Sequence, residues 1–375
     1  MISFNKPVYL EDSSRYMREA ALAGYISGDG KFTKLCSQEL KKITGAEHVN
    51  LTTSGSTSLD MAAILCGLKE GDEVILPSFT FSSTANAVVL TGATPVFTDI
   101  RPDTMNIDEN LIEDAITDKT KAIFPVHYAG VACEMDRIME IAKAHDLKVV
   151  EDAAQCVMST YKGTPLGTIG DFGCISFHET KNLTMGEGGA LIIKDRQDVY
   201  KAEILREKGT DRSRFFRGEI DKYSWVDKGG SYLPSDLNAA YLYPQLLSVA
   251  EITADRVASF EHYFEALSPL ADKELIELPV IPEGCVHNGH IFYIKLKDLQ
   301  QRTSFIAHMK SKQIGAVFHY VPLHSAAAGI KYGRFHGEDR FTTRESERLV
   351  RLPMYFGLTE SDRQLIIDEI YKFFE

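Results

Sequence analysis

A lysine between two short apolar runs is the first feature of the sequence that suggests chemistry. Residues 174–177 are predicted to form a buried strand that contains Ser176, and residues 190–193 the next strand. Between them, polar residues lead to Lys181 and then to a glycine-rich turn. Desolvation at a strand end would lower the pKa of this lysine and give a nucleophilic amine. An ordinary surface lysine is the alternative, and it is the commoner case.

A hydroxyl-rich segment, residues 52–59, follows another predicted strand and opens a predicted helix. Free N–H groups and the positive helix end make such a turn suitable for phosphate, with Ser56 and Thr57 as candidate ligands. The segment lacks the Gly-Lys-Ser/Thr of a nucleotide P-loop, and no Gly-x-Gly-x-x-Gly occurs in the chain. A capped helix start without a ligand is equally compatible with this segment.

An aromatic ring and a carboxylate follow two further predicted strands. Phe81 lies just beyond residues 74–76, where its ring can lie against a planar ligand, although an aromatic residue there is more often part of the core. Glu151 and Asp152 follow residues 149–150 and point in opposite directions, so we expect one of them, Asp152, to face inward. A buried carboxylate requires a cationic partner.

Together these side chains match the needs of pyridoxal 5′-phosphate. Its aldehyde requires an amine, and its phosphate requires N–H donors. Its ring requires a flat partner, and its pyridine nitrogen requires a carboxylate. Each residue alone is ambiguous, but the ordered set favours this cofactor. The set is Ser56, Thr57, Phe81, Asp152, Ser176 and Lys181.

Alternating short strands and helices position these residues. Such alternation predicts a mainly parallel sheet covered by helices on both faces, with the ligand at the carboxyl ends of the strands. Residues 206–230 carry four arginines with little periodicity and are predicted to be a long functional loop. A long helix near residue 252 leads out of the first domain. We therefore expect a large domain over residues 1–250 and a smaller α+β domain over residues 251–375.

Composition limits the class of protein. The 375 residues carry a net charge of −12, which argues against nucleic-acid or membrane-surface binding. No apolar run is long enough for a membrane helix, and the first residues do not resemble a secretory signal. The six cysteines form no Cys-x-x-Cys pair, so neither disulfides nor zinc are indicated and a cytoplasmic location is expected.

Five motifs resemble the DegT/DnrJ/EryC1/StrS family of sugar aminotransferases over nearly the whole chain. The resemblance implies the α/β fold of type I pyridoxal phosphate enzymes, in which a mainly parallel seven-stranded sheet is followed by a smaller C-terminal α+β domain. It also implies a homodimer with active sites at the subunit interface. The motifs are residues 53–59, 77–81, 151–155, 176–182 and 319–324.

The resemblance also implies a role for each site residue. Lys181 would be joined to the cofactor and move protons, and Asp152 would pair with the pyridine nitrogen. The remaining cofactor contacts would be Gln155 at the ring hydroxyl, Phe81 on the ring, and Ser56, Thr57 and Ser176 at the phosphate. His319, Tyr320 and His324 would line the sugar-nucleotide side, and Arg212, Arg214 and Arg217 would meet its diphosphate. Where many relatives carry an asparagine from the neighbouring subunit, this chain has Leu233, with Ser231 as a possible substitute.

Three stretches, residues 101–108, 127–136 and 215–218, are closest to one subgroup of the family. That likeness implies transfer of an amino group from L-glutamate to C4 of dTDP-4-dehydro-6-deoxy-D-glucose, with another nucleotide keto-sugar as the alternative. A lysine at 181, where a related dehydratase branch has histidine, favours amino transfer.

Two other classes of protein remain open. One is a metal-dependent sugar enzyme that uses His319 with His324, or His287 with His290, although neither pair has a carboxylate at ligand spacing. The other is a non-catalytic regulator that binds the cofactor. A regulator would need a basic DNA-binding segment, and none is visible.

Overall fold

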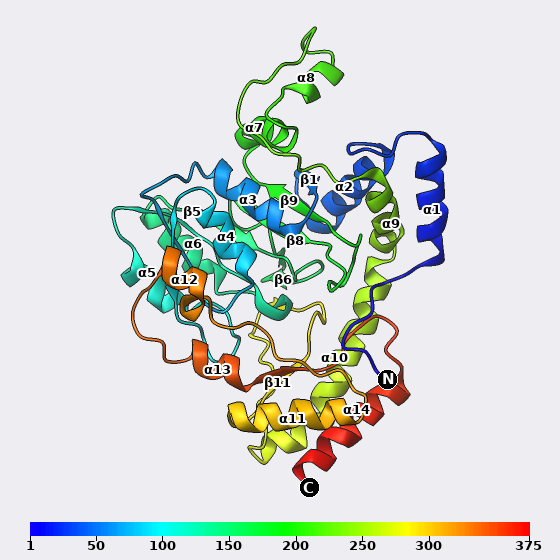
Figure 1. The fold of residues 1–375 in the computed structure, drawn as a ribbon, viewed down its shortest axis with the longest axis vertical. Coiled ribbons are helices and arrows are strands. Elements are labelled where there is room, and N and C mark those ends of the chain that lie inside the picture. The colour runs from blue at the N-terminus through cyan, green and yellow to red at the C-terminus, as the bar shows by residue number, and fades with distance from the viewer.

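A sheet of eight strands forms the centre of the computed structural model, which describes residues 1–375 (Figure 1). The strand order is β1-β9-β8-β5-β4-β2-β3-β12. Only β9 is antiparallel to its neighbours, so the mainly parallel sheet is confirmed. The strands are β1 His48–Thr52, β2 Glu73–Pro77, β3 Thr94–Thr98, β4 Thr120–Ile123, β5 Lys148–Asp152, β8 Phe172–Ser176, β9 Gly189–Ile193 and β12 Arg334–Phe335.

Helices cover both faces of this sheet because successive residues of each strand point to opposite sides. Val74 and Leu76 of β2 pack in one core with residues of α3, α4 and α7, whereas Ile75 packs with residues of α5 and α6 on the other face. These helices are α3 Gly55–Leu65, α4 Ser82–Val89, α5 Ile112–Ala115, α6 Met135–Ala144 and α7 Arg196–Arg206. A third core joins the β1 end of the sheet to α1 Glu11–Leu22, α2 Lys31–Thr44 and α9 Asp236–Leu247.

A second lobe contains most of the last third of the chain. The long helix α10, Val249–Asp272, leads into it, and its two-stranded sheet pairs β11, Tyr293–Lys295, with β13, Leu349–Arg351. Three further helices complete it, namely α11 Leu299–Ser311, α13 Thr342–Arg348 and α14 Glu360–Phe374. This arrangement agrees with the expected α+β character. Ile2, from the opposite end of the chain, packs in the core of this lobe.

The structure differs from the sequence predictions at three places. The sheet has an eighth strand, β12, because a segment beyond α12, Ala327–Tyr332, pairs with the free edge of β3. The predicted loop 206–230 contains the short helix α8, Arg212–Phe216, and projects with α7 from the top of the molecule in Figure 1. Residues 316–320, whose apolar character predicts a strand, form none, and Val317 makes only an isolated bridge to Arg351.

A small sheet of β6 Thr160–Tyr161, β7 Thr164–Pro165 and β10 Cys285–Val286 completes the secondary structure. Among all the helices of the chain, none has the length and apolar character needed to cross a bilayer.

Candidate active site

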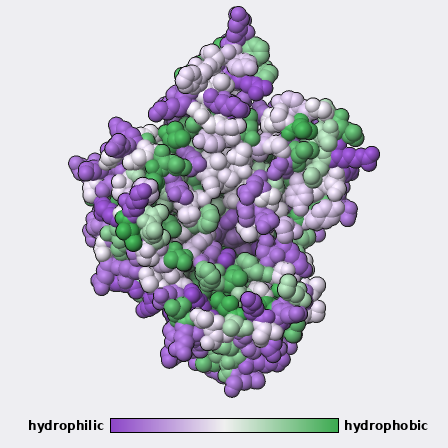
Figure 2. Space-filling view, in the orientation of Figure 1, coloured by the Kyte–Doolittle hydropathy of each residue, from purple (hydrophilic) through white to green (hydrophobic).

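The carboxyl ends of β1, β5 and β8 and the segment after β2 surround a cavity of about 450 Å³. Figure 2 shows a hydrophilic recess in this region, between the main body and the lower lobe. Eight of the thirteen predicted site residues line the cavity. They are Ser56, Phe81, Asp152, Gln155, Ser176, Lys181, His319 and Tyr320.

Lys181 and Asp152 are the two charged groups on which the prediction depended, and both line the cavity. No hydrogen bond or ion pair engages the Lys181 amine, and loss of hydration lowers its pKa to about 8 although Asp152 opposes the shift. Burial raises the pKa of the Asp152 carboxyl, which is only 6% exposed. The arrangement therefore holds an amine that is available as a nucleophile beside a carboxylate that lacks a bonded cation.

Two hydroxyl groups orient the Asp152 carboxylate. Thr84 Oγ1, on α4, donates to Asp152 Oδ2 at 2.7 Å, and the Thr80 and Thr84 hydroxyls are 2.9 Å apart. The Ala154 N–H donates to the other carboxylate oxygen at 3.2 Å. These bonds favour the charged carboxylate and partly offset its burial.

Glu151, the neighbour of Asp152, is also fully buried, so the expectation that one of the two faces inward was too simple. Its carboxylate faces the opposite side of the sheet, where it accepts hydrogen bonds from three N–H groups of the 167–170 segment. His127 Nε2 lies 2.9 Å from the same carboxylate. The opposite face thus supplies its own donors, and Glu151 has a structural role.

The start of α3 provides the expected anion site. Ser54 caps the helix, and the N–H groups of Gly55 and Ser56 in its first turn have no partner within the helix. The Ser56 hydroxyl lies 2.6 Å from that of Ser83, and both residues line the cavity. A Cβ atom on Gly55 would come within 2.8 Å of the Ser176 side chain, so glycine permits this close approach of helix and strand.

Aromatic and amide side chains form the wall on the other side. Gln155 Oε1 accepts a hydrogen bond from the Ala129 N–H, and its amide nitrogen donates to the Tyr320 hydroxyl at 3.1 Å. The His319 and Tyr320 rings stack at 3.6 Å between centroids. Phe81 also lines the cavity, and it is 58% exposed.

Five predicted residues lie outside this cavity, among them Arg214 and Arg217, which pair with Glu219. Thr57 is engaged at the helix start, where its hydroxyl accepts from the Ser54 N–H at 3.0 Å. His324 lies 2.7 Å from the Ser78 hydroxyl and 3.2 Å from a carboxylate oxygen of Asp339. Arg212 lies on α8, where its guanidinium covers the ring of Phe216.

The histidines of the metal alternative also have separate partners. His290 Nδ1 lies 2.8 Å from the Asn182 amide oxygen, His319 Nδ1 lies 2.8 Å from the Tyr128 hydroxyl, and His287 accepts from a backbone N–H. Nowhere in the chain do three His, Cys, Asp or Glu side chains gather closely enough to hold a metal ion.

Sequence reasoning did not place Arg351 in the cavity, and it considered His290 only as part of a possible metal pair. Both come from the C-terminal part of the chain. Neither follows a strand of the main sheet. The rule that ligands lie at the carboxyl ends of parallel strands therefore did not locate them. Arg351 stands in an ordinary Val-Arg-Leu-Pro segment that has no recognisable motif.

The residues present fit pyridoxal phosphate. The Lys181 amine is unpaired, the Asp152 carboxylate lacks a cation that a protonated pyridine nitrogen would supply, and the start of α3 offers N–H donors for a phosphate. An α/β fold with this site defines a fold type I pyridoxal phosphate-dependent aminotransferase.

Comparison with known proteins identifies the family. The model of the DegT/DnrJ/EryC1/StrS aminotransferase family matches residues 9–371, so the chain belongs to that family and is a sugar aminotransferase dependent on pyridoxal phosphate. An uncharacterized protein of Methanocaldococcus jannaschii, MJ1066, is 34% identical over 339 residues, which are 88% of this chain and 86% of that protein.

Solved structures agree with this assignment. The aminotransferase TlmJ from Streptoalloteichus hindustanus superposes with a TM-score of 0.91 at 28% identity, covering 100% of this chain and 99% of that chain. The PMP form of Spr1654 from Streptococcus pneumoniae, a putative sugar aminotransferase, gives 0.90 at 26% identity with the same coverage. The aminotransferase fold predicted from the sequence is therefore confirmed.

Proposed function

We propose that the protein transfers the amino group of L-glutamate to C4 of dTDP-4-dehydro-6-deoxy-D-glucose. The product would be dTDP-4-amino-4,6-dideoxy-D-galactose, as made by dTDP-4-amino-4,6-dideoxygalactose transaminase for enterobacterial common antigen or O-antigen. Residues 101–108, 127–136 and 215–218 support this substrate by their likeness to that subgroup. The alternative is another nucleotide keto-sugar, either a 3-keto sugar or one that yields the gluco epimer at C4.

The observation that carries the reaction type is the free amine of Lys181 beside the buried carboxylate of Asp152. Pyridoxal phosphate supplies an aldehyde and an electron-withdrawing ring. Lys181 would hold the aldehyde carbon of the cofactor, and its amine would take a proton from the α-carbon of the donor and return a proton to C4 of the sugar. A pKa of about 8 suits both tasks near neutral pH. Asp152 keeps the pyridine nitrogen protonated.

The other cavity residues would bind the cofactor and orient the substrates. The N–H groups of Gly55 and Ser56, with the hydroxyls of Ser56 and Ser176, would hold the phosphate. Thr57 supports the start of α3 through its capping bonds. Phe81 would cover the cofactor ring and Gln155 would meet its hydroxyl, while His319 and Tyr320 would line the sugar side.

We further propose a homodimer in which the projecting segment of one subunit reaches the sugar-nucleotide side of its partner's site. Arg212 on this segment has an incomplete pairing, with Glu207 at 4.0 Å, whereas Arg214 and Arg217 pair with Glu219. Arg212→Ala should weaken binding of the sugar nucleotide. This role of the arginines is wrong if Arg212→Ala, Arg214→Ala and Arg217→Ala each leave the affinity for the sugar nucleotide unchanged.

A cytoplasmic location is proposed because all six cysteines are free thiols. Four of them are buried in the cores and two are partly exposed. A reducing compartment keeps such thiols unpaired.

The test of the proposed function uses the purified chain with pyridoxal phosphate. The protein should turn yellow, and borohydride reduction followed by peptide mapping should place the label on Lys181. NMR of the products formed from 4-keto and 3-keto dTDP-sugars with L-glutamate then identifies the carbon and its configuration. A colourless protein with no label on Lys181 would exclude the proposal.

A further inference from the structure

Tyr128 is a fully buried tyrosine whose hydroxyl has a single hydrogen-bond partner in the chain. Its oxygen lies 2.8 Å from Nδ1 of His319. If Nδ1 carried the proton of the imidazole, the hydroxyl hydrogen of Tyr128 would be enclosed in the core without an acceptor, which is unfavourable. Tyr128 therefore donates the hydrogen bond and Nδ1 accepts it.

The tautomer of His319 follows from this hydrogen bond. Burial lowers the pKa of His319 well below its usual value, and the charges of Arg351 and Lys181 add to the shift, so the ring is neutral at pH 7. A neutral imidazole carries one proton, and with Nδ1 as the acceptor this proton is on Nε2. His319 lines the cavity, and its Nε2 has no hydrogen-bond partner in the chain. The Nε2–H group is therefore a donor available to a molecule in the cavity.

The neighbouring residue, Tyr320, offers a second donor by the same reasoning. Gln155 Oε1 accepts from the Ala129 N–H, so the amide nitrogen of Gln155 is the atom that donates to the Tyr320 hydroxyl. The hydroxyl hydrogen of Tyr320 is then free for another acceptor, and Tyr320 also lines the cavity. This wall thus presents two hydrogen-bond donors.

The two donors lie within electrostatic reach of the reacting groups. The charge of Lys181 helps to lower the pKa of His319, and the charge of Asp152 helps to raise the pKa of Tyr320, after burial in both cases. A carbonyl oxygen only accepts hydrogen bonds, whereas a hydroxyl group has a hydrogen of its own that needs an acceptor. Two donors beside the reacting amine therefore favour a carbonyl oxygen as their ligand.

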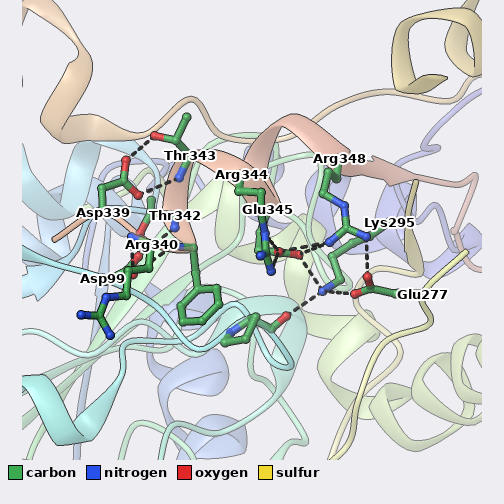
Figure 3. A network of polar contacts seen from close by, with 12 residues as sticks. Asp99, Glu277, Lys295, Asp339, Arg340, Thr342, Thr343, Arg344, Glu345 and Arg348 are labelled. Carbon is green, nitrogen blue, oxygen red and sulfur yellow. Dashed lines mark hydrogen bonds and ion pairs between the residues drawn. The ribbon is translucent and has the colours of Figure 1, made fainter. Parts of the chain in front are cut away.

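The core holds Tyr128 in one position. Its N–H donates to Asn106 Oδ1 at 2.8 Å, and its ring packs against that of Tyr293 at 5.7 Å between centroids. Tyr293 begins β11, and Lys295 of the same strand pairs with Glu345 at 2.8 Å in the polar network of Figure 3. A hydroxyl fixed by such packing keeps its hydrogen bond to His319 in one orientation.

We propose that Tyr128 is a positioning residue that fixes His319 as the Nε2–H tautomer, so that His319 donates a hydrogen bond to the carbonyl oxygen of the keto sugar. The inference rests on the proposed function, because it requires a keto sugar to enter this cavity. Tyr128 does not line the cavity and acts only through His319.

The first test reads the tautomer directly. Solid-state ¹⁵N NMR of the cofactor-loaded enzyme with labelled histidine should show an unprotonated Nδ1 and a protonated Nε2 for His319, assigned by the loss of its signals in His319→Asn. Tyr128→Phe should shift the Nδ1 signal, because it removes the hydrogen bond. A protonated Nδ1 in the wild type would overturn the inference, as would an unmoved Nδ1 signal in Tyr128→Phe.

The second test measures the ligand by calorimetric titration. Enzyme with its cofactor in the aldehyde form cannot aminate, so it can be titrated with dTDP-4-dehydro-6-deoxy-D-glucose and with dTDP. Tyr128→Phe should weaken binding of the keto sugar by about 2- to 10-fold, the range for one hydrogen bond, and leave dTDP binding unchanged. His319→Gln, whose amide nitrogen can reach the position of Nε2, should bind the keto sugar better than His319→Asn, whose amide reaches only that of Nδ1.

Tyr263→Phe is the matched control. Tyr263 is also fully buried, lies outside the cavity, and donates its hydroxyl to the Pro353 carbonyl oxygen at 3.1 Å. Its loss should change neither affinity. Equal losses of keto-sugar affinity in Tyr128→Phe and Tyr263→Phe would reject the role of Tyr128, and so would a loss in Tyr128→Phe that dTDP shares.

Failure of the proposed function is recognised separately, because the wild-type protein would then neither bind nor aminate the keto sugar. Normal amination by the wild type, with the same affinity for the keto sugar in Tyr128→Phe, rejects the role of Tyr128 alone.

Discussion

At the scale of single residues, the unpaired amine of Lys181 should destabilise the protein without its cofactor. Its pKa is lowered to about 8 in the folded state against 10.5 when unfolded, so the unfolded state binds more protons between these values. The destabilisation is complete below pH 8 and disappears as the pH approaches 10.5. Lys181→Met should therefore raise the melting temperature of the apoprotein at pH 7, with a smaller gain at pH 10. Calorimetry at the two pH values measures this, and an equal gain at both would contradict it.

Thr84 should act as a positioning residue for Asp152. Thr84→Val removes the hydrogen bond that lowers the pKa of the Asp152 carboxyl, so this pKa should rise and the charged form should be lost at a higher pH. We expect kcat to fall about 10- to 100-fold, the range for a hydrogen bond to a charged group. The acid limb of the pH–rate profile should move to higher pH. Thr84→Ser keeps the hydroxyl and should restore both, whereas an unmoved profile in the valine variant would reject the role.

The residues that sequence analysis located share one property. Lys181 and Ser56 follow strands of the main sheet and Asp152 ends one, and the carboxyl ends of parallel strands meet at one edge. Thr84 and Arg351 could not be found in this way. Thr84 lies within a helix and Arg351 in a different lobe, so only the tertiary structure brings them to the site.

At the scale of secondary structure, Asp99 links the main sheet to the strand that carries Arg351. Its carboxylate accepts hydrogen bonds from the N–H groups of Arg340, Phe341 and Thr342 at the start of α13. Asp99→Ala leaves these groups without a partner and should cost about 1–3 kcal/mol in the free energy of unfolding. It should also raise the KM for L-glutamate, since β13 follows α13 directly and Arg351 is the only arginine that lines the cavity.

Asp298→Ala provides the comparison for Asp99→Ala. Asp298 caps α11 in the same lobe by accepting from the Gln301 N–H, so its loss should cost about 1 kcal/mol and leave the KM unchanged. Urea denaturation and steady-state kinetics measure both effects. Equal KM changes in the two variants would show that general destabilisation, and not the position of β13, is the cause.

Elements with a strong periodic pattern were predicted well, whereas those that depend on tertiary pairing were not. The regular alternation of strands and helices from β2 to α6 was recognised from apolar spacing. β12 contains only two residues and exists only because the edge of β3 is free to pair. Residues 316–320 have the apolar character of a strand, but only Val317 pairs, in an isolated bridge, and His319 and Tyr320 line the cavity.

At the scale of the whole molecule, the only tryptophan of the chain reports on the proposed dimer. Trp225 is 80% exposed in the single chain and lies on the projecting segment. If this segment packs against a second subunit, the emission of the protein should be blue-shifted when concentrated and shift to the red on dilution. Fluorescence and sedimentation over the same concentration range test this. A dimer by sedimentation with the emission of an exposed indole would place the interface elsewhere.

Ile2 packs among residues that the ribosome makes last, such as Ile314, whose neighbour Gly315 donates its N–H to the Ile2 carbonyl. At translation rates of about 5–20 residues per second, Ile2 must wait roughly 16–60 seconds for this partner. During that interval its apolar side chain is open to chaperones or to other nascent chains. Docking of Ile2 therefore has to follow the synthesis of residues 313–315 of the C-terminal lobe.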